Sequence, residues 1–332
     1  MPTPASPTAP ATAGSTRRGL AQVCAAGVLW GTGGLAVHEL HEREGMASGT
    51  VSAWRMGLAA LVLLVVVLVL RQGPAVVALA RRHPVRTGLL GVATAAYQGL
   101  YFAAVLTAGI GVATVVALGL APPLVTVVEC LRERRAPRPG ELVALAAALA
   151  GLALVTYGGS DAAAGPSPLL GVGLAVAAAV GYAATTLVGR TVSQEAPPLA
   201  LTTLATTVGA LLLLPWAAVE AAHGLPVVTA DPVSLAWLVW LGVATMALAY
   251  GLLYAGLRTT SSGTATVATL LEPVSAALLA ALVAGERLGP VGVAGGVLIL
   301  LAVAVRAVTE PRAGAGPGRG AAGAGAQPAA RR

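Results

Sequence analysis

The sequence is poor in charged residues, and it contains no lysine. Charged residues make up 10% of the 332-residue chain, hydrophobic residues make up 57%, and every one of the 20 basic residues is arginine because there is no lysine. Soluble domains average about 25% charged and about 45–50% apolar residues. We therefore expect an integral membrane protein, and we attribute the net charge of +7 to cationic loops rather than to nucleic-acid binding.

Patterns that carry enzyme chemistry are also missing. The two cysteines, Cys24 and Cys130, lie within or at the end of apolar segments and form no C-x-x-C pair. There is no H-E-x-x-H motif, phosphate loop or serine elbow. His38 and His41 have a spacing compatible with weak metal binding, but a solvated loop explains them better. We expect no catalytic residue, no metal, no cofactor and no enzymatic activity.

Ten apolar segments follow one another along the chain, each near the length of about 20 residues that a transmembrane helix needs. The sequence predicts an all-α integral membrane protein whose tails, residues 1–18 and 309–332, are disordered and cytoplasmic. The expected spans are 19–37, 50–70, 87–108, 111–130, 141–158, 169–189, 199–219, 233–257, 262–285 and 289–308.

The arginines predict the orientation. With a cytoplasmic N-terminus, Arg43 and Arg287 are the only arginines in the outer connections and Arg55 lies inside a span. Every other arginine then falls on the inner side, which is the distribution that cytoplasmic loops show. We expect a multi-pass protein of the cytoplasmic membrane with both termini in the cytoplasm, surrounded by the lipid bilayer.

The two halves of the sequence resemble each other at a shared offset of about 152 residues. The matched positions include Trp30 with Tyr182, Gly57 with Gly209, and 113–115 with 265–267. Each half holds five spans, and an odd number makes the second half enter the membrane from the opposite side. The sequence thus predicts two inverted five-helix repeats, 19–158 and 169–308, a plan common in secondary transporters with the solute site between the halves.

The ninth span carries a carboxylate and a proline near its middle, Glu272 and Pro273. A charge at that depth costs at least about 2.5–3.5 kcal/mol on insertion scales. Pro273 removes a backbone donor and directs its ring at the carbonyl of Thr269. We expect this helix to face a water-filled cavity, where Glu272 binds a proton or a cationic group of a substrate. The alternative is a structural carboxyl group that bonds hydroxyls of neighbouring helices.

Two further charged residues have competing explanations. Arg55 lies near the outer end of the second span, where snorkelling to the headgroups is the favoured explanation and a gate residue or anion anchor is the alternative. A direct pair with Glu272 is not expected, because about 10 Å of depth separates the two residues. Glu129, three residues before Arg132, is expected to form a surface ion pair.

Aromatic and amide side chains recur in the middle of the spans. Trp30 and Tyr182 occupy equivalent positions in spans 1 and 6, and they form either cavity walls or helix contacts. The other candidates for substrate or ion binding are Tyr97, Gln98 and Tyr101 in span 3 and Tyr250 and Tyr254 in span 8. Each stripe lies on one face of its helix, which leaves packing and cavity lining as alternatives.

Three prolines inside spans predict broken helices that act as hinges: Pro122, Pro123 and Pro273. The pattern Gly27-x-x-x-Gly31 fits a close approach of helices.

These residues give the chain a resemblance to the drug/metabolite transporter superfamily, in particular to the EamA-type transporters. The resemblance covers residues 19–308. It rests on 27–31 in span 1, 54–55 at the start of span 2, 121–123 and 133–134 around the end of span 4, and 271–274 and 285–288 around span 9. It implies ten helices, alternating access, and export or import of small metabolites or drugs from a site between spans 1, 3, 4, 6, 8 and 9. Export is favoured, protons are a candidate coupling ion, and the sequence leaves the homo-oligomeric state open. Alternatives from other classes are a membrane scaffold or sensor that transports nothing, and an intramembrane enzyme.

Overall fold

The computed structural model describes residues 13–157, 166–283 and 289–309, which form helices joined by short connections, with no strand among them. The first half contains α1 (Ala13–Glu44), α2 (Ser48–Val69), α3 (Gly73–Arg82), α4 (Pro84–Ala108), α5 (Ile110–Arg132) and α6 (Pro139–Tyr157). The second half contains α7 (Pro168–Ser193), α8 (Pro198–Ala222), α9 (Pro232–Trp240), the π-helix η1 (Leu241–Leu248), α10 (Ala249–Gly256), α11 (Ser262–Ala268), α12 (Leu271–Val283) and α13 (Pro290–Thr309).

Ten helical segments of the described residues are long and apolar enough to cross a membrane. A helix satisfies all backbone hydrogen bonds within one segment, which the bilayer interior requires. The eighth span is α9, η1 and α10 in one continuous run, and the ninth is α11 followed by α12. The all-α architecture with ten spans, predicted from apolar length, is confirmed.

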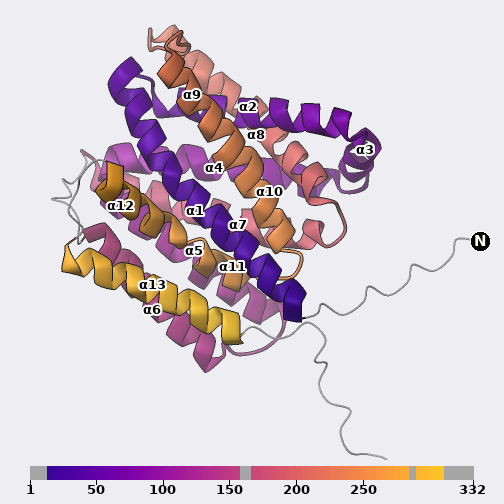
Figure 1. Cartoon of the computed structure of the whole chain (residues 1–332), viewed down its shortest axis with the longest axis vertical. Coiled ribbons are helices and arrows are strands. Elements are labelled where there is room, and N and C mark those ends of the chain that lie inside the picture. The colour runs from indigo at the N-terminus through magenta and orange to yellow at the C-terminus, as the bar shows by residue number, and fades with distance from the viewer. Residues whose placement is uncertain (1–12, 158–165, 284–288, 310–332) are drawn as a thin grey trace, which may run out of the picture.

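The contacts between helices follow the symmetry of the two repeats. In span 1, α1 packs against α10 and α12 of the second half, and in span 6, α7 packs against α4 and α5 of the first half. The remaining spans pair across the halves, α2 with α8 and α6 with α13, and Figure 1 shows α6 and α13 side by side at one edge. The arrangement is the one expected of two inverted five-helix units.

The two ends of the bundle are distinguished here as face A and face B. Face A is the end where α1 begins, and there the Thr259 hydroxyl donates to the carbonyl of Ser15 at 3.0 Å. Face B is the end where α1 finishes, and there Glu44 accepts hydrogen bonds from Thr229 at 2.7 Å and from Ser234 at 2.8 Å.

The helix at the N-terminus is longer than expected in both directions. It begins at Ala13, inside the tail expected to be disordered, and it continues to Glu44 through the segment expected to be a loop. The side chains of Glu39 and Arg43, four residues apart on one helical face, form an ion pair of 3.0 Å, which stabilises this extension. The short helix α3, with Arg81 and Arg82 in its last turn, was not predicted.

The prolines behave differently from one another. Span 9 is interrupted before Pro273, where the Thr269 carbonyl accepts the amide of Glu272 at 2.9 Å in place of the donor that proline lacks. In contrast, α5 runs through Pro122 and Pro123 without interruption, so the predicted break there is wrong. Proline is tolerated inside transmembrane helices where neighbouring helices support the freed backbone groups, and α5 packs between α4 and α7.

Candidate functional site

A cavity of about 570 Å³ lies inside the bundle, open at face B and reaching Glu272 in the middle of span 9. Its mouth is formed by residues of the α1–α2 connection and by the end of α8 with the connection that follows it. Its lining residues are Trp30, Gly33, Gly34, Val37, His41, Met46, Ala47, Ser48, Arg55, Tyr97, Gln98, Tyr101, Phe102, Val105, Tyr182, Trp216, Glu220, Leu225, Tyr250 and Glu272.

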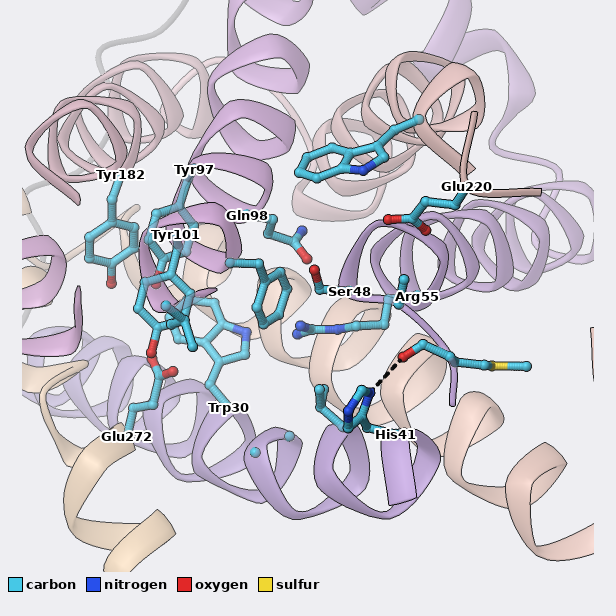
Figure 2. Close-up of a pocket in the computed structure, with 18 of the residues that line it drawn as sticks. Trp30, His41, Ser48, Arg55, Tyr97, Gln98, Tyr101, Tyr182, Glu220 and Glu272 are labelled. Carbon is cyan, nitrogen blue, oxygen red and sulfur yellow. Dashed lines mark hydrogen bonds between the residues drawn. The ribbon is translucent and has the colours of Figure 1, made fainter. Parts of the chain in front are cut away.

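Glu272 is placed against the cavity by the close approach of two helices. A Cβ atom on Gly31 would lie 2.5 Å from the Glu272 carbonyl, and one on Gly27 would lie 3.1 Å from the Cα of Thr269. The predicted close approach at these two glycines is therefore present, and it holds the broken span 9 directly against α1. The side chain of Glu272 then points into the cavity (Figure 2).

The Glu272 carboxylate forms no hydrogen bond or ion pair within the part of the chain that the structure describes. Its surroundings are aromatic instead, with Tyr97, Tyr101 and Tyr182 gathered on its side of the cavity (Figure 2). A carboxylate away from bulk water needs a proton or a cation to compensate its charge. The alternative of a structural carboxyl bonded to helix hydroxyls finds no support in this geometry.

The aromatic side chains form a continuous wall from four helices. The ring centroids are 5.0 Å apart for Trp30 and Tyr250, 5.0 Å for Tyr97 and Tyr182, and 6.0 Å for Tyr97 and Tyr101. The Tyr182 hydroxyl donates to the hydroxyl oxygen of Thr269 at 2.6 Å, at the residue where span 9 is interrupted. The wall thus combines apolar faces, which suit an organic solute, with hydroxyl groups fixed in position.

The π-helix η1 supports the polar side of the cavity. The Trp30 indole donates to the carbonyl of Thr245 at 2.8 Å, and the Arg55 guanidinium donates to the Thr245 hydroxyl at 3.2 Å. The Gln98 amide lies 3.8 Å from the sulfur of Met246. Segments of π-helix occur often at functional sites, and this one positions residues from three other helices.

Arg55 and Gln98 both retain unused hydrogen-bonding capacity. Gln98 is 4% exposed, and its Oε1 atom has no partner among the described residues; neither has the Nε atom of Arg55. Arg55 lines the cavity and does not snorkel to the surface, so the favoured explanation of this residue is wrong. No carboxylate of the described residues lies within ion-pair distance of Arg55. Figure 2 shows Arg55 and Glu272 on opposite sides of the cavity.

Residues at the mouth were missed by sequence reasoning. Glu220 is 9% exposed, and its carboxylate accepts the backbone amides of Gly49 and Thr50 at 3.2 and 2.6 Å and the Thr50 hydroxyl at 2.6 Å. His41, expected in a solvated loop, lies on α1 with its Nδ1 atom 3.2 Å from the Met46 carbonyl oxygen. The sequence did offer a signal for Glu220. It is an acidic residue near the end of an apolar span, and no basic residue stands beside it to pair with it.

The predicted site residues divide into two groups. Seven of the eight candidates for substrate or ion binding meet around the cavity, together with Arg55: Trp30, Tyr97, Gln98, Tyr101, Tyr182, Tyr250 and Glu272. Tyr254 does not; it is fully buried against Gly189 of α7. Spans 2 and 7 contribute lining residues that were not expected, whereas none of the described lining residues comes from α5, the fourth span. Glu286 and Arg287, which carry part of the resemblance, lie outside the described residues.

Toward face A the interior is filled. Tyr254, Leu253 and Leu257 are all 0% exposed. The first two lie near the end of span 8, and Leu257 follows it directly. None of these three residues lines the cavity, which ends on the face B side of them. The cavity therefore connects with face B alone within the described part of the bundle.

Ten transmembrane helices in two repeats, arranged around a cavity that reaches a mid-membrane carboxylate, define a multi-pass membrane transporter. The model of the EamA-like transporter family matches residues 17–157 and again residues 169–307. The chain belongs to this family, as its resemblance had indicated.

Two curated relatives are also named as transporters, and one solved structure shares the fold. The chain is 31% identical over 219 residues to the uncharacterized transporter YwfM of Bacillus subtilis (strain 168), a match covering 65% of this chain and 71% of that protein. It is 28% identical over 276 residues to the uncharacterized inner membrane transporter YicL of Salmonella typhimurium (strain LT2), covering 82% and 89%. One solved structure, described only as "Crystal structure of protein", shares the fold with a TM-score of 0.72 at 21% identity, covering 89% of this chain and 96% of that one.

Proposed function

We propose that this chain is a secondary active transporter of the cytoplasmic membrane that exports a small organic solute by alternating access. The observation that carries the proposal is the cavity of about 570 Å³, which reaches Glu272 from face B and is closed toward face A. A site near the middle of the membrane, open to one side at a time, is what alternating access requires.

The proposed orientation places face A in the cytoplasm together with both termini. Arg190, Arg258 and Arg306 all belong to the helix ends on this side, whereas Arg43 lies at the end of α1 on face B. The excess of arginine on one side supports a cytoplasmic face A. In this orientation the cavity opens to the outside, which is the state after release of an exported solute.

Glu272 is the proposed coupling group. The carboxylate has no protein partner among the described residues, so its charge is compensated either by a proton or by a cationic group of the solute. The two occupants exclude each other, and an inward proton gradient then drives the solute outward. The aromatic wall beside Glu272 favours an organic cation over a hydrated metal ion, because cations are attracted to aromatic faces.

The far side of the cavity suits an anionic or hydrogen-bonding group. Arg55 and Gln98 both line the cavity across from Glu272 (Figure 2). Among the described residues, the buried Arg55 Nε and Gln98 Oε1 atoms have no hydrogen-bond partner. We propose that the solute carries a cationic group toward Glu272 and an anionic or polar group toward Arg55. Opposite charges at two ends of one cavity select for solutes with the matching separation.

The deciding experiment measures flux in proteoliposomes with an imposed pH gradient, using a panel of amino acids, nucleosides and cationic drugs. We expect gradient-dependent movement of at least one solute and its loss in Glu272→Gln, which keeps the shape but cannot ionise. Glu39→Gln is the matched control, because Glu39 pairs with Arg43 at the end of α1 and does not line the cavity. Full transport by Glu272→Gln with an unchanged pH dependence would remove Glu272 from the mechanism.

The same panel separates the other function classes. No flux of any solute across the panel would favour a scaffold or sensor, and chemical turnover of a solute without net flux would favour an intramembrane enzyme. For a solute that is transported, blocking its anionic group as an amide tests Arg55. We expect the blocked solute to lose affinity for the parent protein and to lose little for Arg55→Gln.

A further inference from the structure

The connection between α10 and α11 is held by side chains from the ends of α7 and α5. At its start, the Gln194 amide donates to the carbonyls of Leu257 and Arg258 at 3.0 and 3.1 Å. In its middle, the Arg190 guanidinium donates to the carbonyl of Thr260. Gln194 and Arg190 lie at the end of α7, in span 6.

At the end of this connection, a carboxylate from α5 binds the first amides of α11. Glu129 accepts the backbone N–H of Ser262 at 2.8 Å and that of Gly263 at 3.0 Å. No ion pair with Arg132 occurs within the described residues, so the predicted surface pair is wrong. The next amide, of Thr264, is bound by the side chain of Ser261 at 3.2 Å.

The charges of these side chains match the helix ends that they bind. A helix leaves unpaired carbonyls at its C-terminus and unpaired amides at its N-terminus. The cationic Arg190 and the amide group of Gln194 bind the carbonyls beyond α10, and the anionic Glu129 binds the amides of α11. Both sets of contacts are favourable in the field of the helix dipoles. Separation of α10–α11 from α5 and α7 removes the protein partners of all these groups.

Solvent already has access to the cytoplasmic side of these contacts. A second cavity, of about 370 Å³, is lined by Glu129, Arg190, Gln194 and Ser262 together with residues of the two neighbouring helix ends. Water can therefore replace the contacts when the helices part. On the other side of the contacts, the buried Tyr254 and Leu257 fill the space toward the central cavity.

We propose that Glu129, Arg190 and Gln194 form the gate on face A, and that the solute passes this face only when they release the α10–α11 connection. The inference rests on the proposed transport function, because a gate has meaning only for a protein that changes its open side. In the closed state the contacts shift the equilibrium toward the conformation open at face B, and weakening them shifts it toward face A.

The test measures how fast a thiol within the gate, at the residue whose amide Glu129 binds, reacts from each side of the membrane. Ser262 is 0% exposed and its hydroxyl has no partner among the described residues, so Ser262→Cys adds a probe without removing a contact. The protein carries Cys24→Ser and Cys130→Ser, and a membrane-impermeant maleimide is applied to inside-out and right-side-out vesicles. We expect slow reaction in the parent.

In Glu129→Gln we expect labelling from the cytoplasmic side to become about tenfold faster, the order expected for loss of hydrogen bonds to a charged group. Gln194→Ala, which leaves Glu129 in place, is expected to act in the same direction and serves if Glu129→Gln does not fold. The matched control is Glu39→Gln, because Glu39 pairs with Arg43 at face B and lines neither cavity. Its labelling rate is expected to equal that of the parent.

Two results would overturn the gate. One is an unchanged labelling rate in both Glu129→Gln and Gln194→Ala; the other is an equal increase in Glu39→Gln, which indicates general loosening. The labelling needs no solute, so it separates the two proposals. If labelling becomes faster in a protein that moves no solute, the contacts do control access to position 262 but the transport proposal is rejected. If the protein transports a solute and labelling is unchanged, only the gate is rejected.

Discussion

The indole N–H of Trp30 donates to the main-chain carbonyl of Thr245 at 2.8 Å, and this bond joins the two halves of the protein at the cavity wall. Trp30 belongs to α1 and Thr245 to the π-helix η1 of span 8. The hydroxyl of the same threonine accepts from Arg55 at 3.2 Å. One residue of η1 therefore orients both an aromatic and a cationic side chain of the site.

Replacing Trp30 with Phe tests this bond. We expect Trp30→Phe to lower the free energy of unfolding by about 1 kcal/mol, the usual net value of a buried hydrogen bond, and to weaken solute binding by disordering the wall. Melting in detergent measures the first effect, and solute-dependent stabilisation measures the second. The matched control is Trp240→Phe, because the Trp240 indole donates to Thr32 at 2.9 Å in an exposed position. Equal losses in the two variants would contradict a special role for Trp30.

The sequence was sufficient to predict the ten spans, which depend on apolar length, and the isolated polar residues inside them. Glu272 was identified because a carboxylate in the middle of an apolar span has a high cost in lipid. Tyr254 was misplaced because its spacing from Tyr250 shows that both lie on one helix, not which neighbour each meets. Glu220 was missed, and Glu129 was assigned to a surface ion pair, because acids at the ends of spans normally face water. The backbone amides that bind them come from helices distant in the sequence.

The close approach at Gly31 gives a second prediction. A Cβ atom there would meet the Glu272 carbonyl at 2.5 Å and the backbone nitrogen of Ala276 at 2.9 Å. We expect Gly31→Ala to lower the free energy of unfolding by about 1–3 kcal/mol, as overpacking does, and to displace Glu272. Gly57→Ala is the control, since nothing lies within 4 Å of its added methyl group. Thermal melts of the two variants in detergent compare them directly, and unchanged stability of Gly31→Ala would disprove the packing argument.

The start of α9 gives a prediction about pH. Asp231, outside the membrane span, accepts the Ser234 amide at 2.8 Å and its hydroxyl at 2.9 Å. The hydrogen bond from the Ser234 amide, followed by that from its hydroxyl, lowers the pKa of Asp231 below its ordinary value. A lowered folded-state pKa contributes stability above the unfolded-state pKa of about 3.9, and this contribution is lost as the pH falls through the folded-state value.

We therefore expect Asp231→Ala to melt at a lower temperature than the parent near neutral pH, with the difference shrinking in acid below about pH 3.9. Asp231→Asn is the control, because asparagine also caps a helix N-terminus but does not ionise. Its difference from Asp231→Ala is expected to be independent of pH. A difference between parent and Asp231→Ala that stays constant down to the lowest pH would show that the charge of Asp231 adds nothing.

Water access to position 272 is the prediction on which the transport mechanism depends most. In a protein with Cys24→Ser and Cys130→Ser, we expect Glu272→Cys to react with a membrane-impermeant maleimide applied from face B and to be protected from face A. The control is Leu278→Cys on the same helix, because Leu278 is 51% exposed on the outside of the bundle, where lipid replaces water. If both cysteines were unreactive from either side, the carboxylate of Glu272 would face neither solvent nor solute, and it could not exchange a proton for a substrate.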